Sequence, residues 1–415
     1  MSTTRPDPAG LGARAEAMIK ALAPISAEPG RLIRLFLSGE HRRAADVTAG
    51  WMREAGMTVS EDALGTVRGR WGAGPGRRQL LIGSHLDSVI DAGNYDGPLG
   101  VIVGILAVDH FAKAGVTLPF GIDVLAFGDE EGSRFPSTLS SSAACVGEFE
   151  MSSLPFADRE GVTLADALAR YGKSVADIPA AAYRRDEAAA YVEVHIEQGP
   201  VLEDANEPLG VVTGIVGQTR MRVTVTGMAG HAGTVPMTMR RDALAGAAEL
   251  VLAAERIAQA HAAEGMVATV GRIEASPGAT NIIPGRVSFT VDLRAMEDAA
   301  RRQAVEELQA EGFRLVEARG LQIEFEPFHD VAAVKCAPAL QDTLAAAISD
   351  LGGEPIRIPS GAGHDAQMMA RLCPSAMMFV RCRGGISHNP AEYASPSDMG
   401  LSAAALIRFI ERFRP

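Results

Sequence analysis

Two short apolar runs flank a longer apolar segment in the first third of the chain. Leu80–Ile82 and Gly121–Phe127 are predicted to be buried strands, because short apolar runs bounded by glycine suit a covered sheet. Gly100–Ala114 between them is predicted to be an apolar helix. A strand, a helix and a strand at this spacing indicate a parallel pair with a crossover helix, and therefore an α/β domain.

Segments on both sides extend this domain. Amphipathic helices are predicted at Ala13–Leu22 and His41–Ala55, and a hairpin at Met57–Glu61 and Thr66–Trp71. Tyr191–Pro200 is predicted to be a strand with a polar residue at every second position.

From about Gly217 the pattern changes to alternating strands and amphipathic helices. Their order is β-α-β-β-α-β, the split unit of ferredoxin-like folds. The predicted elements are Thr219–Thr226, Asp242–His261, Met266–Glu274, Arg286–Leu293, Glu297–Glu311 and Gln322–Pro327. We therefore expect an inserted α+β domain at 215–328, and one α/β domain, a mixed sheet flanked by helices, from 1–214 and 329–415.

Composition limits the class of protein. A chain of 415 residues favours two domains over one core. The formal net charge of −12 argues against nucleic acid or an anionic membrane as partner, because both need a basic surface. The negative net charge does not exclude an anionic small substrate, because a single arginine in the site can bind an anion despite the negative charge of the whole chain.

The cysteines and the lengths of the apolar runs indicate the cellular compartment of the protein. The four cysteines form no C-x-x-C pair and are interpreted as reduced thiols. Met1–Gly30 lacks a basic start followed by an apolar core, and no stretch approaches the about 18 apolar residues of a membrane span. We therefore expect a cytoplasmic protein.

Polar side chains gather after the predicted strands of the α/β domain. His85 and Asp87 follow the first strand two residues apart, and Asp96 lies on a glycine-rich turn just beyond. Imidazole is a good ligand for zinc-like metals, and a neighbouring carboxylate can hold its ring in one tautomer. A lone histidine beside a sheet is more often structural, so this stretch alone leaves both readings open.

Further candidates follow other strands. Glu130 and Glu131 come after Gly121–Phe127, where α/β sheets place their ligands. An exposed acidic loop is the plainer alternative, although adjacent carboxylates repel unless a cation joins them. His195 and His388 are likewise predicted at strand ends. Three imidazoles and three carboxylates match a site for two metal ions about 3.5–4 Å apart that share one carboxylate.

Other polar positions are ambiguous when taken singly. His231 lies between glycines, Asn281 lies on a glycine-rich link, and Arg294 ends a predicted strand. Each is more often structural than functional. The glycines around Gly361 expose backbone amides, which suits the binding of an oxyanion or a carboxylate.

Taken together, the motifs resemble the hydantoinase/carbamoylase branch of the M20 metallopeptidase-like amidohydrolases. This branch includes N-carbamoyl-L-amino-acid hydrolases, allantoate amidohydrolases and β-ureidopropionases. The motifs run in order from Gly83 to Pro390: GSHLDS, DEEGSRF, VEVHIEQGPVLE, GHAGTVPM, GATNIIPGRVSFTVDLR, SGAGHDAQ and GISHNPAEY.

The resemblance implies a role for each matching residue. Two divalent ions, zinc or else manganese, cobalt or nickel, would be held by His85, Asp96, Glu131, His195 and His388, with Asp96 bridging. Glu130 would act as the general base, and Asp87 would orient His85. His231 would stabilise the oxyanion, and the substrate contacts would be Gln198, Asn281, Arg294 and Gly361.

The resemblance also implies a homodimer in which the inserted domain serves as lid and dimerisation domain, so that His231 reaches the partner's site. The implied reaction is hydrolysis of the carbamoyl C–N bond of N-carbamoyl-L-amino acids or of a ureido acid such as allantoate. One departure is that Ala143-Ala144 follow Ser141-Ser142, where the family commonly has a basic residue. This departure bears on the shape of the substrate.

Two alternative functions are open. The first is a di-metal exopeptidase or N-acyl-amino-acid deacylase on the same fold, against which stand His195 and the pair Asn281 and Arg294. The second is a dimeric binding module without activity, against which stands the complete set of ligands and base.

Overall fold

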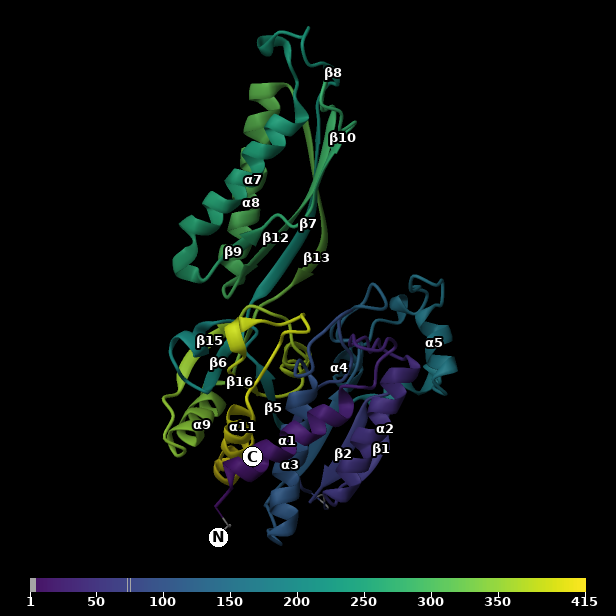
Figure 1. The fold of residues 1–415 in the computed structure, drawn as a ribbon, viewed down its shortest axis with the longest axis vertical. Coiled ribbons are helices and arrows are strands. Elements are labelled where there is room, and N and C mark those ends of the chain that lie inside the picture. The colour runs from purple at the N-terminus through teal and green to yellow at the C-terminus, as the bar shows by residue number, and fades with distance from the viewer. Residues whose placement is uncertain (1–4, 73, 75) are drawn as a thin grey trace. The chain divides into compact units, whose positions relative to one another are not determined.

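The computed structural model describes residues 5–72, 74 and 76–415. Two compact units are distinguished (Figure 1). Unit 1 extends to Gly214 and resumes from Lys335 to Pro415, and unit 2 comprises Ile215–Val334. The predicted return at residue 329 falls inside strand β13 (Gln322–Val331) of unit 2, so the chain re-enters unit 1 a few residues later.

Among the described residues, nine strands form the sheet of unit 1, in the order β1-β2-β4-β3-β5-β16-β6-β14, with β15 paired to β6. The four central strands β4, β3, β5 and β16 are parallel, whereas β1, β2 and β6 pair antiparallel with their neighbours. The strands are β1 (Thr58–Glu61), β2 (Val67–Trp71), β3 (Gln79–His85), β4 (Gly121–Phe127), β5 (Ala188–Ile196), β6 (Leu209–Ile215), β14 (Val334–Lys335), β15 (Ile356–Ser360) and β16 (Ser375–Val380).

Helix α3 (Pro98–Lys113) is the helix predicted between the two apolar runs. Proline in its first turn and an almost wholly apolar sequence favour a buried helix that starts here. It packs directly on the sheet at Gly100, where a Cβ atom would lie 2.1 Å from the carbonyl oxygen of Val194 in β5. This close contact fixes the start of α3, and therefore the preceding Asp96, beside β5.

The remaining helices of unit 1 flank its sheet (Figure 1). The terminal helices α1 and α11 pack against each other and against α3, so both ends of the chain cover the same core. The helices are α1 (Pro8–Leu22), α2 (Gly39–Glu54), α4 (Ser140–Cys145), α5 (Leu164–Arg170), α6 (Val201–Asp204), α9 (Pro338–Ser349), α10 (Ala366–Met369) and α11 (Pro396–Arg412), with 3₁₀ turns η1 (Met151–Ser153), η2 (Val175–Ala181) and η5 (Arg383–Gly385). The predicted α/β class is confirmed.

Unit 2 has an antiparallel sheet in the order β10-β12-β7-β13, with β9 also paired to β12. This is the strand order of the predicted ferredoxin-like unit. Alternate residues of β12 are buried, so one face of the sheet packs on the core with helices α7 and α8. The elements are β7 (Gly217–Thr226), β9 (Val267–Thr269), β10 (Ile273–Ser276), β12 (Arg286–Ala295), β13, α7 (Ala243–Ala260) and α8 (Asp298–Arg319), with 3₁₀ turns η3 (Met237–Met239) and η4 (Ala262–Glu264).

A small ladder joins β8 (Gly230–His231) to β11 (Ile282–Ile283) near one end of unit 2 (Figure 1). Two predicted elements of unit 2 differ from the observed ones. The single strand at Met266–Glu274 is two strands, β9 and β10, and both pair with β12. The helix predicted to end at Glu311 continues to Arg319 and ends at Gly320, which adopts the left-handed conformation typical of a helix C-terminus.

No helix in the described part of the chain is long and apolar enough to span a membrane.

Candidate metal centre

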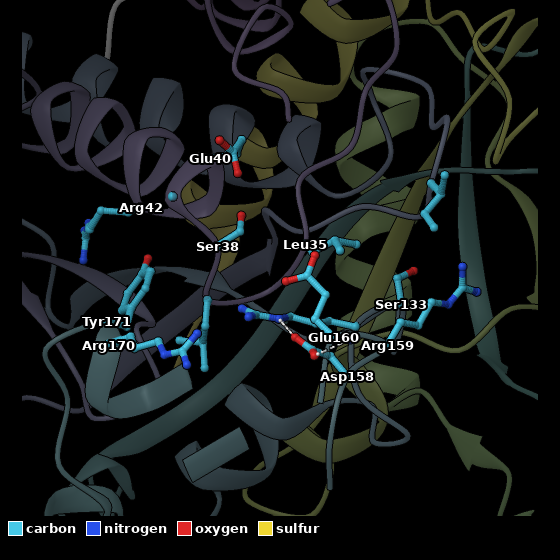
Figure 2. Close-up of a pocket in the computed structure, with 14 residues that line it drawn as sticks. Leu35, Ser38, Glu40, Arg42, Ser133, Asp158, Arg159, Glu160, Arg170 and Tyr171 are labelled. Carbon is cyan, nitrogen blue, oxygen red and sulfur yellow. Dashed lines mark hydrogen bonds and ion pairs between the residues drawn. The ribbon is translucent and has the colours of Figure 1, made fainter. Parts of the chain in front are cut away.

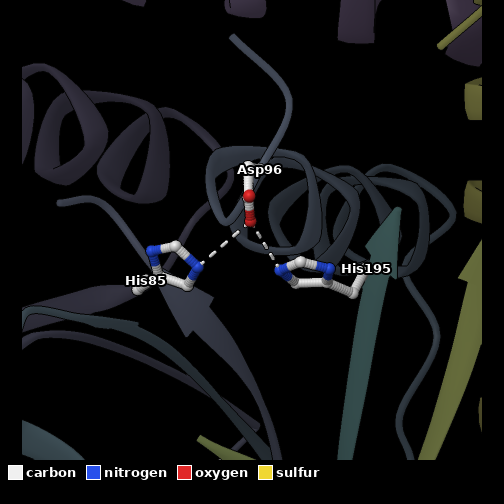
Figure 3. Close-up of side chains that lie close together, drawn as sticks. All are labelled: His85, Asp96 and His195. Atoms are coloured by element: carbon white, nitrogen blue, oxygen red, sulfur yellow. Dashed lines mark ion pairs between the residues drawn. The ribbon is translucent and has the colours of Figure 1, made fainter. Parts of the chain in front are cut away.

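The carboxyl ends of parallel strands β3 and β5 bring two histidines to one carboxylate. His85 ends β3, His195 lies near the end of β5, and Asp96 lies just before α3. The two Nε2 atoms lie 3.5 Å and 3.0 Å from Oδ1 of Asp96 (Figure 3). All three side chains are at most 6% exposed. The cluster lies where α/β sheets place their ligands.

Backbone carbonyls fix the tautomer of both rings. Nδ1 of His85 lies 3.1 Å from the carbonyl oxygen of Asp87, and Nδ1 of His195 lies 2.9 Å from that of Ile196. Because a carbonyl can only accept, both Nδ1 atoms carry the hydrogen, and the Nε2 lone pairs face Asp96. Nε2 of His195 is buried without a hydrogen-bond partner. Lone pairs that face a carboxylate at this range require positive charge between them, which a second ring proton or a metal ion can supply.

Glu130 and Glu131 reach the same cluster from the loop after β4. Oε2 of Glu130 lies 3.9 Å from Nε2 of His85, and Oε2 of Glu131 lies 3.5 Å from Nε2 of His388. The backbone N–H groups of both glutamates donate to the carboxylate of Asp87, at 3.2 Å and 3.3 Å. Asp129 just before them adopts a left-handed conformation, with φ of 61°. A strained residue of this kind persists only where its surroundings enforce it.

Asp87 therefore contacts His85 in a different way from the one expected. The ring is held by the carbonyl of Asp87, whereas the Asp87 carboxylate lies 3.6 Å from Nδ1 and anchors the glutamate loop.

His388 completes the cluster from a loop. It was expected at the end of a strand, but it lies well beyond Val380, the last residue of β16, in a left-handed conformation with φ of 53°. Its Nε2 atom lies 3.3 Å from Oδ2 of Asp96, and its side chain is 52% exposed. We call His85, Asp96, Glu130, Glu131, His195 and His388 the candidate centre.

The charged groups of the candidate centre shift one another's pKa values. Burial raises the pKa of Glu130 well above its usual value, and burial together with the Asp96 charge raises that of Glu131 to about 7. The hydrogen bond to Asp96 raises the pKa of His388 to about 9. Burial opposes ionisation of Asp96, but the three histidines hold its pKa well below its usual value. Protons thus offset part of the cost of crowding these carboxylates, and a cation can do the same.

The donor atoms fit divalent cations. His85, Asp96 and His195 form one group whose ligand atoms lie within 4.8 Å of one another. Further groups of this kind are His85 with Glu130 and Glu131, and Asp96 with Glu131 and His388. Imidazole and carboxylate are ligands of zinc, manganese, cobalt and nickel. Each pair of these three groups shares one residue, namely His85, Asp96 or Glu131.

Two residues that the sequence analysis did not single out brace the candidate centre. Glu392 is buried and accepts hydrogen bonds from the backbone N–H groups of Tyr95 and Asp96. The hydroxyl of Ser387 lies 2.9 Å from both Oδ2 of Asp96 and Oε2 of Glu392. Both residues belong to the motif GISHNPAEY, but no spacing rule connects position 392 with position 96.

A second group lies behind His195. The rings of His195 and His364 have centroids 4.5 Å apart, and Glu193, His195 and His364 form a further group of potential ligands. Nε2 of His364 bonds the hydroxyl of Ser360, while its Nδ1 atom is buried without a partner. Burial lowers the pKa of His364 well below its usual value, so the ring is neutral. His364 belongs to the motif SGAGHDAQ, and no role is predicted for it from the sequence.

The predicted substrate contacts fall in both units. In unit 1, the amide nitrogen of Gln198 donates to Oδ2 of Asp96 at 2.8 Å, and its Oε1 atom is buried without a partner. Gly361 follows β15 and is exposed. In unit 2, His231 is exposed, and the backbone N–H of Ala232 beside it donates to the carbonyl of Asn281. Arg294 forms a two-point ion pair with Asp292, at 3.1 Å and 3.0 Å.

A cavity of about 660 Å³ lies elsewhere in unit 1, between the start of α2 and the segment around Asp158 (Figure 2). No residue of the candidate centre lines it. Two of its arginines are paired within the chain, Arg42 with Glu61 and Arg134 with Asp158.

Comparison with known proteins gives the class of this protein. Residues 81–412 match Peptidase family M20/M25/M40, and the chain belongs to this family. It is 42% identical to allantoate deiminase of Arabidopsis thaliana, over 96% of this chain and 81% of that protein. It is 39% identical to N-carbamoyl-L-amino acid amidohydrolase of Geobacillus stearothermophilus, over 95% and 97% of the two chains.

A solved structure agrees with these relatives. The amidase of the hydantoinase/carbamoylase family from Burkholderia multivorans superposes with a TM-score of 0.90 at 34% identity, covering 99% of this chain and 98% of that one. The resemblance drawn from the motifs is therefore confirmed.

Proposed function

We propose that this chain is a metal-dependent amidohydrolase that cleaves the carbamoyl C–N bond of an N-carbamoyl-L-amino acid or of a related ureido acid such as allantoate. The observation that carries the proposal is the buried group of His85, Asp96 and His195, whose lone pairs and carboxylate converge on one point. Relatives named for these two reactions, at 39–42% identity, support the type of bond.

Five side chains would hold two divalent ions: His85, Asp96, Glu131, His195 and His388. Asp96 would bridge, because its Oδ1 faces His85 and His195 while its Oδ2 faces His388. When bound, such ions polarise a carbonyl group and lower the pKa of water. Zinc is our first choice, with manganese, cobalt and nickel as alternatives.

Glu130 would move the proton. It would accept a proton from the attacking water and later deliver it to the leaving nitrogen, serving first as base and then as acid. Burial and the neighbouring carboxylates raise its pKa, which suits a group that must both accept and release a proton. Asp87 holds the backbone of Glu130 and would keep the carboxylate aimed.

Gln198 and Gly361 would contact the substrate from unit 1. The amide nitrogen of Gln198 donates to Asp96 and Ser387, so Oε1 is left as an acceptor for the substrate. A ureido NH₂ group is a donor that would satisfy this buried oxygen. The backbone around Gly361 would offer N–H groups to the oxyanion that forms at the carbonyl carbon.

Asn281 and Arg294 are proposed to bind the carboxylate of the substrate, but they cannot both do so from one chain. Asn281 precedes the Arg286 end of β12, and Arg294 lies near the other end of this strand. Eight residues of a strand span about 26 Å, far more than a small ureido acid. Their joint use therefore requires two chains, which supports a homodimer in which unit 2 serves as lid and dimerisation domain and His231 serves the partner's oxyanion.

The proposal also covers the compartment. All four cysteines are free and buried. Reduced thiols are typical of the cytoplasm, so we propose this location. Recovery of the native protein from a membrane or extracellular fraction would contradict it.

The test is ammonia release by protein that is stripped of metal and then reloaded with zinc, manganese, cobalt or nickel. The panel holds N-carbamoyl-L-amino acids, N-carbamoyl-β-alanine, allantoate, N-acetyl amino acids and dipeptides, with free amino groups measured for the last two. Metal-restored turnover of a ureido compound supports the proposal and identifies the substrate. Turnover of only dipeptides or acyl compounds would assign the chain to the exopeptidase or deacylase alternative, and metal binding without turnover to a binding role.

A further inference from the structure

Two of the proposed ligands come from segments far apart in the chain that are joined by one buried carboxylate. Asp96 lies before α3, and His388 lies in the loop before α11. Between them, Oε1 of Glu392 accepts from the N–H groups of Tyr95, at 2.8 Å, and Asp96, at 3.1 Å. Its Oε2 lies 2.9 Å from the hydroxyl of Ser387, the residue before His388. One side chain thus contacts both ligand-bearing segments.

The position of this carboxylate is fixed by its surroundings. Glu392 is 4% exposed, and Gly93 lies so close that a Cβ atom there would come within 2.3 Å of its side chain. Only glycine at position 93 leaves room for Glu392 beneath the turn that carries Asp96. A side chain so confined transmits a change of its length directly to the backbone on either side.

The Ser387 hydroxyl extends this link to the side chain of Asp96. It lies 2.9 Å from Oδ2 of Asp96 and 2.9 Å from Oε2 of Glu392, and it also accepts from Gln198 at 3.2 Å. A hydroxyl has one proton, so it can donate to only one of the two carboxylates at a time. Backbone and side chain of Asp96 are therefore both braced by the segment that carries His388.

We propose that Glu392 is a positioning residue that sets the distance between Asp96 and His388 and thereby the affinity for divalent ions. This inference rests on the proposed metal-dependent function. The length of the Glu392 side chain matters, because Oε1 must accept from two backbone N–H groups while Oε2 accepts from the hydroxyl of Ser387. Buried partners that orient ligands in this way typically change metal affinity by about 10–100-fold when they are altered.

Two conservative substitutions separate the effect of the Glu392 side-chain length from the effect of its charge. Glu392→Gln keeps the length and the Oε1 acceptor, and its amide nitrogen can donate to Ser387, whose proton then goes to Asp96. Glu392→Asp keeps the charge but is shorter by one methylene, about 1.5 Å, so it cannot meet both segments. Asp62→Ala is the control, because Asp62 also accepts from two backbone N–H groups, those of Leu64 and Thr66, outside the candidate centre.

The measurement is Zn²⁺ affinity of metal-stripped protein in competition with a chromophoric chelator, together with the absorption spectrum of the Co²⁺-loaded protein. We expect Glu392→Asp to weaken Zn²⁺ binding by about 10–100-fold and to alter the Co²⁺ spectrum. Glu392→Gln should bind like the wild type, and Asp62→Ala should lower only the melting temperature.

The outcomes that overturn the inference are distinct from failure of the proposed function. Wild-type Zn²⁺ affinity in Glu392→Asp would overturn the inference alone. Weak Zn²⁺ binding in Glu392→Gln would also overturn it, because the charge of Glu392 would then set the affinity even where its length is kept. A wild-type protein that binds no divalent ion would overturn the metal centre and this inference with it.

Discussion

The candidate centre of unit 1 and the predicted substrate contacts of unit 2 are held in opposite ways. In unit 1, His85, Asp96 and His195 are buried and fixed by backbone hydrogen bonds. In unit 2, His231 and Asn281 are exposed, and Arg294 already pairs with Asp292 of its own strand. The first set is buried within one unit, whereas the second is exposed or paired with its own strand in the other unit.

Under the proposed function, this difference matches two kinds of chemistry. Buried, preoriented ligands suit the bond-breaking step, which needs fixed charges in a dry site. Exposed polar residues on a separate unit suit recognition, because they can meet a substrate without a standing cost of burial.

Removal of the proposed base should have the largest effect on the rate. Glu130→Gln keeps the size and the backbone hydrogen bond to Asp87 but cannot accept a proton. We expect kcat to fall by about 10²–10⁴-fold, with metal content unchanged. Metal analysis and single-turnover kinetics check this. Normal turnover by Glu130→Gln would contradict the assignment of Glu130 as the general base.

Removal of metal should destabilise unit 1 and leave unit 2 unchanged. Ions that bind only the folded state stabilise it by about 2.7 kcal/mol at 100 times their dissociation constant. Hydrogen exchange of stripped and zinc-loaded protein should therefore show faster exchange in β3 and β5 of the stripped form and equal exchange in β7 and β12. Equal loss of protection in both units would contradict the division.

Loss of a unit 2 contact should weaken substrate binding without affecting the metal. Arg294→Ala removes a guanidinium proposed to hold the substrate carboxylate, and we expect KM to rise at least about tenfold, since charged hydrogen bonds contribute about 1.5–3 kcal/mol. Arg220→Ala is the matched control, because Arg220 also pairs with Asp292, at 3.2 Å. If both variants raise KM equally, the effect comes from the freed Asp292 and the assignment of Arg294 fails.

A smaller, pH-dependent effect is expected from a buried histidine of unit 1. Burial lowers the pKa of His41 to about 4, and Tyr171 bonds its Nδ1 at 3.1 Å. The ring is therefore neutral in the folded protein. Its contribution to the free energy of unfolding is complete above pH 6.5, the usual pKa of histidine in an unfolded chain. It is lost as the pH falls towards 4, by about 1.4 kcal/mol per pH unit.

His41→Asn provides the comparison, because asparagine cannot gain a proton in this range yet offers an amide near Nδ1. Denaturant unfolding at several pH values should show a flatter decline for the variant than for the wild type between pH 6.5 and 4. Parallel curves would show that His41 does not titrate on unfolding.

The sequence predicts the central strands of unit 1 well, because the apolar runs that mark them are local features of the chain. The apolar runs at Leu80–Ile82 and Gly121–Phe127 are the cores of β3 and β4, and parallel pairing then brings His85 and His195 to one edge. Periodicity predicts the ferredoxin-like strand order of unit 2 in the same way.

The parts that sequence reasoning missed depend on long-range contacts or on unusual backbone. His388 reaches Asp96 from a loop through a left-handed backbone conformation, which no periodicity reveals. Glu392 meets Tyr95 across 297 positions of sequence, so no local pattern connects them.

The placement of β16 between β5 and β6 has a consequence for biosynthesis. Ribosomes release the chain from its N-terminus, so His85, Asp96 and His195 emerge long before Ser375–Val380 and the loop with His388 and Glu392. Until that late strand inserts, the sheet is open between its two halves and the ligand set is incomplete. A nascent or prematurely terminated chain that ends before His388 therefore lacks a residue of the candidate centre, and synthesis past this position becomes a condition for hydrolytic competence.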